Sequence, residues 1–188
     1  MAENKNDVTK VTTAKPKVGG AVFVAPLKTA LPEDAKSELD AAFKNLGYIS
    51  EDGIKNENTA TTEDIKAWGG AVVNSSQKDK TDKFKMTFIE ALNIDVLKFI
   101  YGNSNVEGSL ETGIKIKVGS DEAAEQVMVI DSVLKGGYLK RVVIPIAKLT
   151  EMGEISYSDS NTHGYESTVS AFPDTEGFTH YEYISKKG

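Results

Sequence analysis

Apolar and polar residues alternate through most of the second half of the chain, and this pattern predicts one β-hairpin after another from Leu110 to Ile184. Between Ile114 and Val118 every second residue is apolar, and lysines occupy the positions between them. We therefore expect a strand there with one face against a core and the other face in water.

Two longer apolar runs are separated by Gly136 and Gly137, a pair that suits the tight turns whose twist matches the flanking strands. This arrangement predicts a hairpin of strands 127–134 and 139–144, and Pro145 then marks the end of the second strand or a bulge in it. Further strands are expected at about 147–157 and 164–172, and in a last pair joined by residues 173–177 that ends at Ile184.

Two interpretations compete for the segment that precedes these hairpins. A capping-box spacing at Thr87, with a glutamate three residues later, would start a helix at that position. However, apolar and polar residues alternate strictly over residues 83–88, which indicates a strand. We favour a strand that continues to about Ile89.

An α-helix is then predicted at about residues 93–101. Asn93 is a suitable N-cap, Asp95 complements the positive end of the helix dipole, and Gly102 supplies the stop. A single helical turn is also expected within residues 31–39.

The first half of the chain is more polar. Residues 43–50 resemble a strand, and a turn signal at Gly53 follows them. Residues 54–64 are almost entirely polar, which predicts a long exposed loop between paired strands, whereas apolar residues resume over 65–73 before a second polar stretch at 74–82. The candidate positions on this loop are Asn56, Glu57, Asn58, Thr59, Thr61, Thr62, Glu63 and Asp64.

These elements predict a mainly β fold, either a β-sandwich or a flattened barrel, with the one helix covering an opening or a face. Residues 1–20 are expected to form a flexible arm, residues 21–184 a single β domain, and residues 185–188 a short tail. The domain would begin with an edge strand that Pro26 closes.

Charge and composition narrow the possible functions. The 188 residues carry a formal net charge of −6, which disfavours sequence-specific binding of duplex nucleic acid through a basic patch. The absence of cysteine excludes disulfides, thiolate metal sites and thiol nucleophiles. The charged N-terminus does not resemble a signal peptide, and no segment is long and apolar enough to span a membrane, so we expect synthesis in the cytoplasm and no membrane insertion.

No group of residues has the spacing of a catalytic or metal site, so we expect neither enzymatic activity nor a cofactor or metal. His163 and His180 each stand without a surrounding ligand motif. Residues 159–170 resemble a calcium loop only at their start, because Ser170 replaces the required glutamate. Adjacent acidic residues lie in polar turns, where surface solubility explains them, and the tyrosines and Trp68 are spread as core and sheet residues usually are.

Several motifs, in this order along the chain, resemble those of siphophage major tail proteins, which are tail tube subunits. The likeness covers about residues 21–184, and its motifs are Phe43-x-x-Leu46-Gly47-Tyr48-Ile49-Ser50-Glu51-Asp52-Gly53-Ile54, Phe84-Lys85-Met86-Thr87-Phe88-Ile89-Glu90-Ala91, Asn93-x-x-Val96-Leu97-x-x-x-Tyr101-Gly102 and the Gly136–Gly137 hairpin.

The resemblance implies a β-sandwich or barrel with one flanking helix, assembled as stacked hexameric rings into the hollow tube of a long flexible tail. It also implies that the tube encloses a tape-measure protein, contacts a tail terminator and baseplate or tail-tip proteins, and conducts the genome without sequence-specific DNA binding. The protein would be made in the host cytoplasm and reside in the virion. No additional C-terminal immunoglobulin-like domain is evident.

The resemblance also gives two segments a role in assembly. The polar segment 54–65 matches a family loop that contacts the next ring, and we expect it to become ordered on stacking. The N-terminal arm matches an inter-subunit element, whose candidate residues are Val11, Thr12, Thr13, Lys15 and Lys17.

Two further hypotheses remain open. Negative charge in the lumen would let DNA pass with little friction, provided that Lys115 and Lys117 do not face the channel unpaired. Alternatively, the chain is a phage or cell-surface β-sandwich that binds carbohydrate or protein through loops at 74–82 and 158–163. The tube subunit would form rings or polymers at high concentration, whereas the binding module would stay small.

Overall fold

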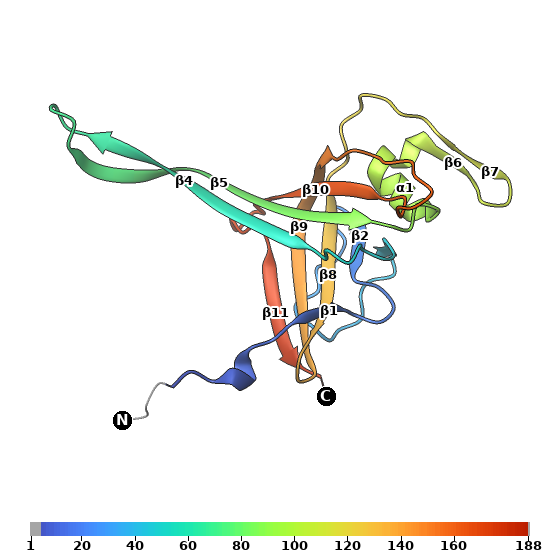
Figure 1. Ribbon diagram of the computed structural model, residues 1–188, viewed down its shortest axis with the longest axis horizontal. Helices are drawn as coiled ribbons and strands as arrows, with labels where there is room; N and C mark the ends of the chain where they lie inside the picture. The colour runs from blue at the N-terminus through green and yellow to red at the C-terminus, as the bar shows by residue number, and fades with distance from the viewer. Residues whose placement is uncertain (1–4, 188) are drawn as a thin grey trace.

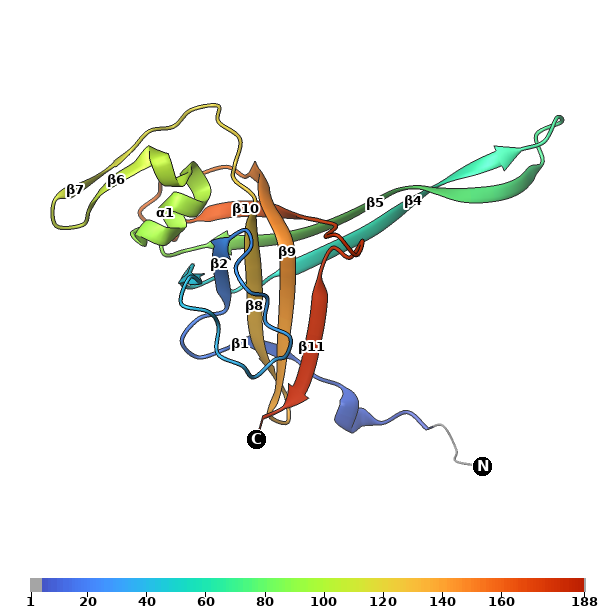
Figure 2. The same cartoon turned by 180° about the vertical axis from the view of Figure 1, so that it is seen from behind.

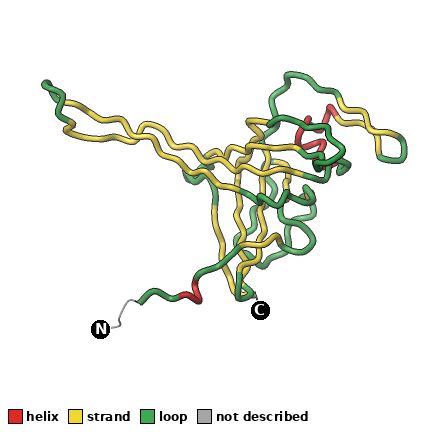
Figure 3. Tube along the Cα trace, viewed as in Figure 1, coloured by secondary structure: helices red, strands yellow, loops and turns green. Residues whose placement is uncertain are grey.

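Two long antiparallel strands, β8 (Gln126–Leu134) and β9 (Tyr138–Met152), form the centre of the fold. The structure is a computed structural model that describes residues 5–187. Figure 1 shows β8 and β9 side by side, with β11 next to β9 and the long strands β4, β5 and β10 running across one end of the pair. The fold is mainly β, as predicted, and Figure 3 shows how little of the described chain is helical.

Each central strand pairs with two different strands along its length. The outer edge of β8 pairs with β1 (Ala14–Pro16) and β2 (Val22–Pro26), and the outer edge of β9 pairs with β10 (Tyr165–Phe172) and β11 (Tyr181–Lys186). The sheet continues from β2 to β3 (Lys44–Asn45), and from β10 to β5 (Val72–Phe88) and β4 (Lys55–Lys66). All these pairs are antiparallel and together form a nine-stranded sheet.

This sheet is open. Its order runs from β3 at one end to β4 at the other, and these two strands do not pair, so the sheet is not a closed barrel. A separate two-stranded sheet consists of β6 (Val106–Ser109) and β7 (Gly113–Ile116). Ile114 and Ile116 of β7 pack against the core, as the alternation in this segment predicted. Two 3₁₀ turns, at Val8–Lys10 and Asn103–Asn105, complete the described elements.

The predicted helix is confirmed as α1 (Ile94–Tyr101), the only α-helix within residues 5–187. The side chain of Asn93 accepts a hydrogen bond from the backbone N–H of Asp95 at 3.0 Å, and Gly102 ends the helix with φ of 94°. The apolar face of α1 is buried against the sheet, where Phe99 meets the edge of Phe88 with ring centroids 5.5 Å apart. Helix and sheet thereby enclose the main core.

The β8–β9 hairpin also forms as predicted. Gly136 and Gly137 both have positive φ, at 85° and 77°, which explains why glycines occupy this turn. The pairing register shifts between Gln126 and Met128, opposite Pro145, so the proline lies at a bulge. Because β9 continues through that bulge, the two strands expected at 139–144 and 147–157 are one strand that ends at Met152.

Other local predictions are wrong. Residues 31–39 do not form a helical turn, and the strand expected at 43–50 is reduced to β3 and an isolated bridge between Ile49 and Phe88. The loop expected at 54–64 is instead almost wholly the strand β4, whose pairing with β5 shifts register at Thr61 and again at Ile65. At the C-terminus, β11 continues to Lys186.

Candidate assembly surfaces

The most prominent surface feature is a hairpin that extends well beyond the core, which we call the hairpin arm (residues 55–82). All twelve residues of β4 are exposed, and so are the first ten residues of β5. From Asp82 onwards β5 enters the core. Figures 1 and 2 show the arm projecting away from the rest of the fold, without a neighbouring element over most of its length.

The hairpin arm has little to stabilise it within one molecule. Cross-strand ion pairs join Glu57 to Lys85 at 2.8 Å and Glu63 to Lys78 at 3.9 Å, but the side chains of all four residues are about half exposed or more. Exposed pairs of this kind contribute about 0–1 kcal/mol each. A two-stranded hairpin without a packed face is at best marginally stable in water, so the arm is suited to packing against another molecule.

All eight candidate residues of the predicted loop lie on β4, in the hairpin arm. Seven of them point into solvent without a buried contact, and Asn56 reaches the base of the arm. The segment is exposed, as expected, but it is a strand and not a loop.

The tip of the hairpin arm, residues 65–73, is apolar. Ile65, Val72 and Val73 are about half exposed or more, and Trp68 is fully exposed. The turn is closed by a hydrogen bond from the N–H of Ala67 to the carbonyl oxygen of residue 71 at 2.8 Å. The even spread of aromatic residues along the sequence predicted Trp68 to be a core or sheet residue, whereas it lies at the exposed tip. The short apolar run between two polar segments is the feature of the sequence that could have indicated this position.

The base of the hairpin arm is fixed by a buried carboxylate. Asp82 accepts hydrogen bonds from Thr179 Oγ1 at 2.6 Å and Asn56 Nδ2 at 2.7 Å, and also contacts His180 Nδ1. Burial raises the pKa of Asp82, but these hydrogen bonds outweigh it and leave the pKa below its ordinary value. His180 also meets the ring of Phe84 edge-on. The cluster ties both strands of the arm to the segment before β11.

The N-terminal arm lies along its own molecule. Lys15 belongs to β1 and is opposite Val133 of β8, while Thr12 Oγ1 accepts a hydrogen bond from the backbone N–H of Lys135 at 2.9 Å. Val11 and Thr13 are exposed. Residues 1–4 of the predicted arm lie outside the described residues.

Lys17, the last candidate residue of the N-terminal arm, joins a buried ion pair. Its Nζ lies 3.1 Å from Oδ2 of Asp131, and Arg141 binds the same carboxylate through two hydrogen bonds of 2.7 and 2.9 Å. The remaining guanidinium nitrogen of Arg141 donates to the carbonyl oxygens of Asp34 and Ser37. One fully buried arginine therefore connects the arm, the central hairpin and the segment that was expected to be helical.

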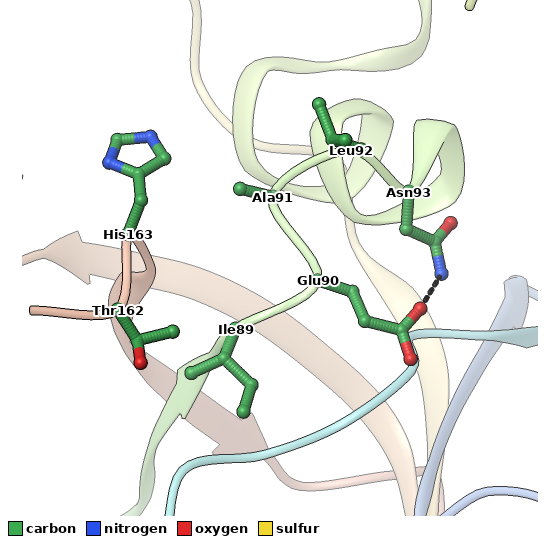
Figure 4. Close-up of a pocket in the computed structure, with 7 residues that line it drawn as sticks. All are labelled: Ile89, Glu90, Ala91, Leu92, Asn93, Thr162 and His163. Carbon is green, nitrogen blue, oxygen red and sulfur yellow. Dashed lines mark hydrogen bonds between the residues drawn. The ribbon is translucent and has the colours of Figure 1, made fainter. Parts of the chain in front are cut away.

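A shallow apolar hollow of about 640 Å³ lies beside the start of α1. Figure 4 shows Ala91 and Leu92, from the loop between β5 and α1, opposite Thr162 and His163 from the segment before β10. Leu92 is 70% exposed. The side chain of Glu90 points away from His163 and accepts a hydrogen bond from Asn93 Nδ2 at 2.9 Å. We call this hollow the α1 groove.

The other sequence candidates are not brought together. His163 lies at the α1 groove and His180 at the base of the hairpin arm, and no group of three potential metal ligands occurs within residues 5–187. Residues 74–82, one of the two loops of the alternative binding module, are part of β5. Lys117 is paired with Glu107 at 2.6 Å. No helix in the described part of the chain is long and apolar enough to cross a membrane.

Comparison with known proteins places these surfaces in context. No curated protein matches the chain. A family model described as phage tail tube protein matches residues 1–187.

Proposed function

The chain belongs to the phage tail tube protein family and is a structural component of the phage tail, and we propose that its copies form hexameric rings that stack into the channel for genome delivery. In this role it performs no chemistry. The long flexible tail of the virion would then contain many identical copies, made and assembled in the host cytoplasm.

The observation that carries the proposal is the hairpin arm. Its residues are exposed on both faces, and a two-stranded hairpin of this length lacks the packing that an independent element needs. A neighbouring ring supplies that packing. We therefore propose that the arm, including Asn56 to Asp64, makes the contacts between rings.

Contacts within a ring involve the open margins of the sheet. The outer edges of β1, β4 and β11 have no strand partner within the described chain. Unpaired strand edges favour association, and closed rotational symmetry is the usual way to satisfy them without fibres. The N-terminal arm, with Lys15 and Lys17, would lie at such a margin and join neighbouring subunits.

Passage of DNA through the tube needs a wall that does not hold phosphates. The net charge of −6 supports such a wall, and Lys117 is paired with Glu107, whereas Lys115 is exposed without an ion pair among the described residues, so we propose that it faces away from the channel. During assembly the same lumen would enclose the tape-measure protein. The ends of the tube would bind the tail terminator and the baseplate or tail-tip proteins.

Electron microscopy of the purified protein tests this function directly. We expect rings or tubes at high protein concentration, and a variant in which Asn-Gly replaces residues 60–80 should form rings that do not stack. This variant keeps Asn56 and Asp82, and therefore the base of the arm. Thr61→Ser, an exposed change within the arm, is the matched control and should form normal tubes. Normal tubes from the shortened variant would exclude the arm as the contact between rings.

A further inference from the structure

Two exposed apolar surfaces lie far apart on the described part of the chain. One is convex, the tip of the hairpin arm with Trp68, and the other is concave, the α1 groove with Leu92. Such surfaces usually mark sites of association, because burying them removes apolar area from water. Their opposite curvature makes them candidates for one another.

Their positions exclude contact within one molecule. The tip ends at the first two residues of β5, Val72 and Val73, and the groove begins at Ile89, immediately after the last residue of that strand. A strand of 17 residues spans roughly 55 Å at about 3.3 Å per residue. Figure 1 accordingly shows the tip and α1 toward opposite ends of the long axis. Any contact between these surfaces joins two copies.

We propose that the tip of the hairpin arm docks into the α1 groove of a second copy, with Trp68 as its anchor. The proposal rests on the proposed function and names the surface that receives the arm. Because donor and acceptor surfaces differ, the contact is heterologous and repeats without closing on itself, as stacking of successive rings requires.

The charges at the two surfaces are complementary. Residues 65–73 contain Lys66 and no acidic residue, whereas the residues that line the groove include Glu90, whose carboxylate lies at the Asn93 end, and no lysine or arginine. Lys66 forms no ion pair within residues 5–187. On the groove side, the rings of His163 and Tyr157 lie 5.0 Å apart, and an indole can extend this aromatic pair.

A single contact of this kind is small. One exposed tryptophan buries at most about 250 Å², and the neighbouring apolar residues of the tip add less than a standard protein interface requires. Isolated copies should therefore remain unassembled. Copies held in a ring present several tips at once, and this multivalency makes stacking strong once a ring exists.

Trp68 is the only tryptophan of the chain, so its fluorescence reports the environment of the tip. On assembly of the wild-type protein, we expect the emission to shift to shorter wavelength and iodide quenching to fall several-fold. Leu92→Glu places a charge in the groove at an exposed position and should abolish both changes. Leu110→Glu is the matched control, because Leu110 is 61% exposed and lies at neither surface, and it should behave as wild type.

Crosslinking supplies a second measurement, because the chain has no cysteine of its own. In Ala67→Cys/Ala91→Cys, a short bismaleimide should join one copy to the next and give a ladder of multimers on a denaturing gel. Ala67→Cys/Leu110→Cys should give none.

The outcomes separate the two proposals. Tubes that form with Trp68 still quenched by iodide, or without the ladder, would overturn the docking of the tip while leaving the tail tube function intact. An effect of Leu92→Glu on completed virions but not on purified tubes would mean that another tail protein occupies the groove, and would also overturn it. If the wild-type protein forms no rings or tubes, the proposed function fails and this inference fails with it.

Discussion

Replacement of Asp131 by alanine should be among the most destabilising single changes in the molecule. Arg141 is fully buried, and Asp131 is the only carboxylate that it contacts within residues 5–187. The two hydrogen bonds between them, at 2.7 and 2.9 Å, are charge-assisted and contribute about 1.5–3 kcal/mol each. Their sum agrees with the 3–5 kcal/mol that removal of one partner of a buried ion pair typically costs, so we expect a loss of about 3–5 kcal/mol.

The assays are urea unfolding, which gives the free energy of unfolding, and thermal unfolding, both on dilute, unassembled protein followed by circular dichroism. For a chain of this length, 1 kcal/mol corresponds to about 2–4 °C, so the melting temperature should fall by roughly 6–20 °C. Asp131→Leu combined with Arg141→Met removes both charges, and it should recover much of the lost stability because no unpaired buried charge remains. Two results would refute this reasoning. One is a loss of less than about 1 kcal/mol for Asp131→Ala. The other is a loss in the double variant as large as the sum of the losses from Asp131→Leu and Arg141→Met measured separately.

Three other changes test separate features. The lowered pKa of Asp82 gives the wild-type protein a contribution to stability that is present above about pH 4 and is lost as the pH falls through the folded pKa. Asp82→Asn lacks this contribution, so between pH 6 and pH 3 it should lose less stability than the wild type. Parallel pH curves of the free energy of unfolding, measured in urea, would contradict this. Lys17→Met should lower the free energy of unfolding by less than about 1 kcal/mol, because the lysine side chain is 40% exposed. Amide hydrogen exchange in β1 should nevertheless accelerate, because the ion pair with Asp131 no longer holds this strand against β8. Unchanged exchange would show that the lysine does not hold β1 in place. Gly108→Ala should lower the free energy of unfolding by about 1–3 kcal/mol, because φ is 93° at this position and the new Cβ would lie 2.0 Å from the carbonyl oxygen of Gly113. Gly119→Ala is the control, because a Cβ at Gly119 meets open space. Equal melting temperatures of the two variants would disprove the strain at Gly108.

The elements that the sequence predicted correctly carry their signals locally. Asn93 and Gly102 bracket α1 through caps that need no distant partner, and the turn at Gly136 depends on the φ values of its own residues. The strand alternation of residues 83–88 appears because one of its faces is buried. In each case the information lies within a few residues.

The incorrect predictions involve interactions that a local pattern does not contain. β4 has no buried face, so its residues follow no period of two and read as a loop. Residues 31–39 carry helix-forming signals, but Arg141, about a hundred positions later, binds the carbonyl oxygens of Asp34 and Ser37 and holds the segment in another conformation. The α1 groove brings residues 89–93 together with 162–163, a proximity that sequence spacing does not reveal.

The continuity of β5 has a mechanical consequence. One end of this strand lies in the exposed hairpin and the other pairs with β10 over six successive positions, from Lys83 to Phe88. A pull on the hairpin therefore runs parallel to β5 and loads those backbone hydrogen bonds together in shear, instead of peeling them apart one by one. If the hairpin arm joins successive rings as proposed, stretching or bending of the assembled tail would be resisted inside every subunit by the same strand that reaches out of it.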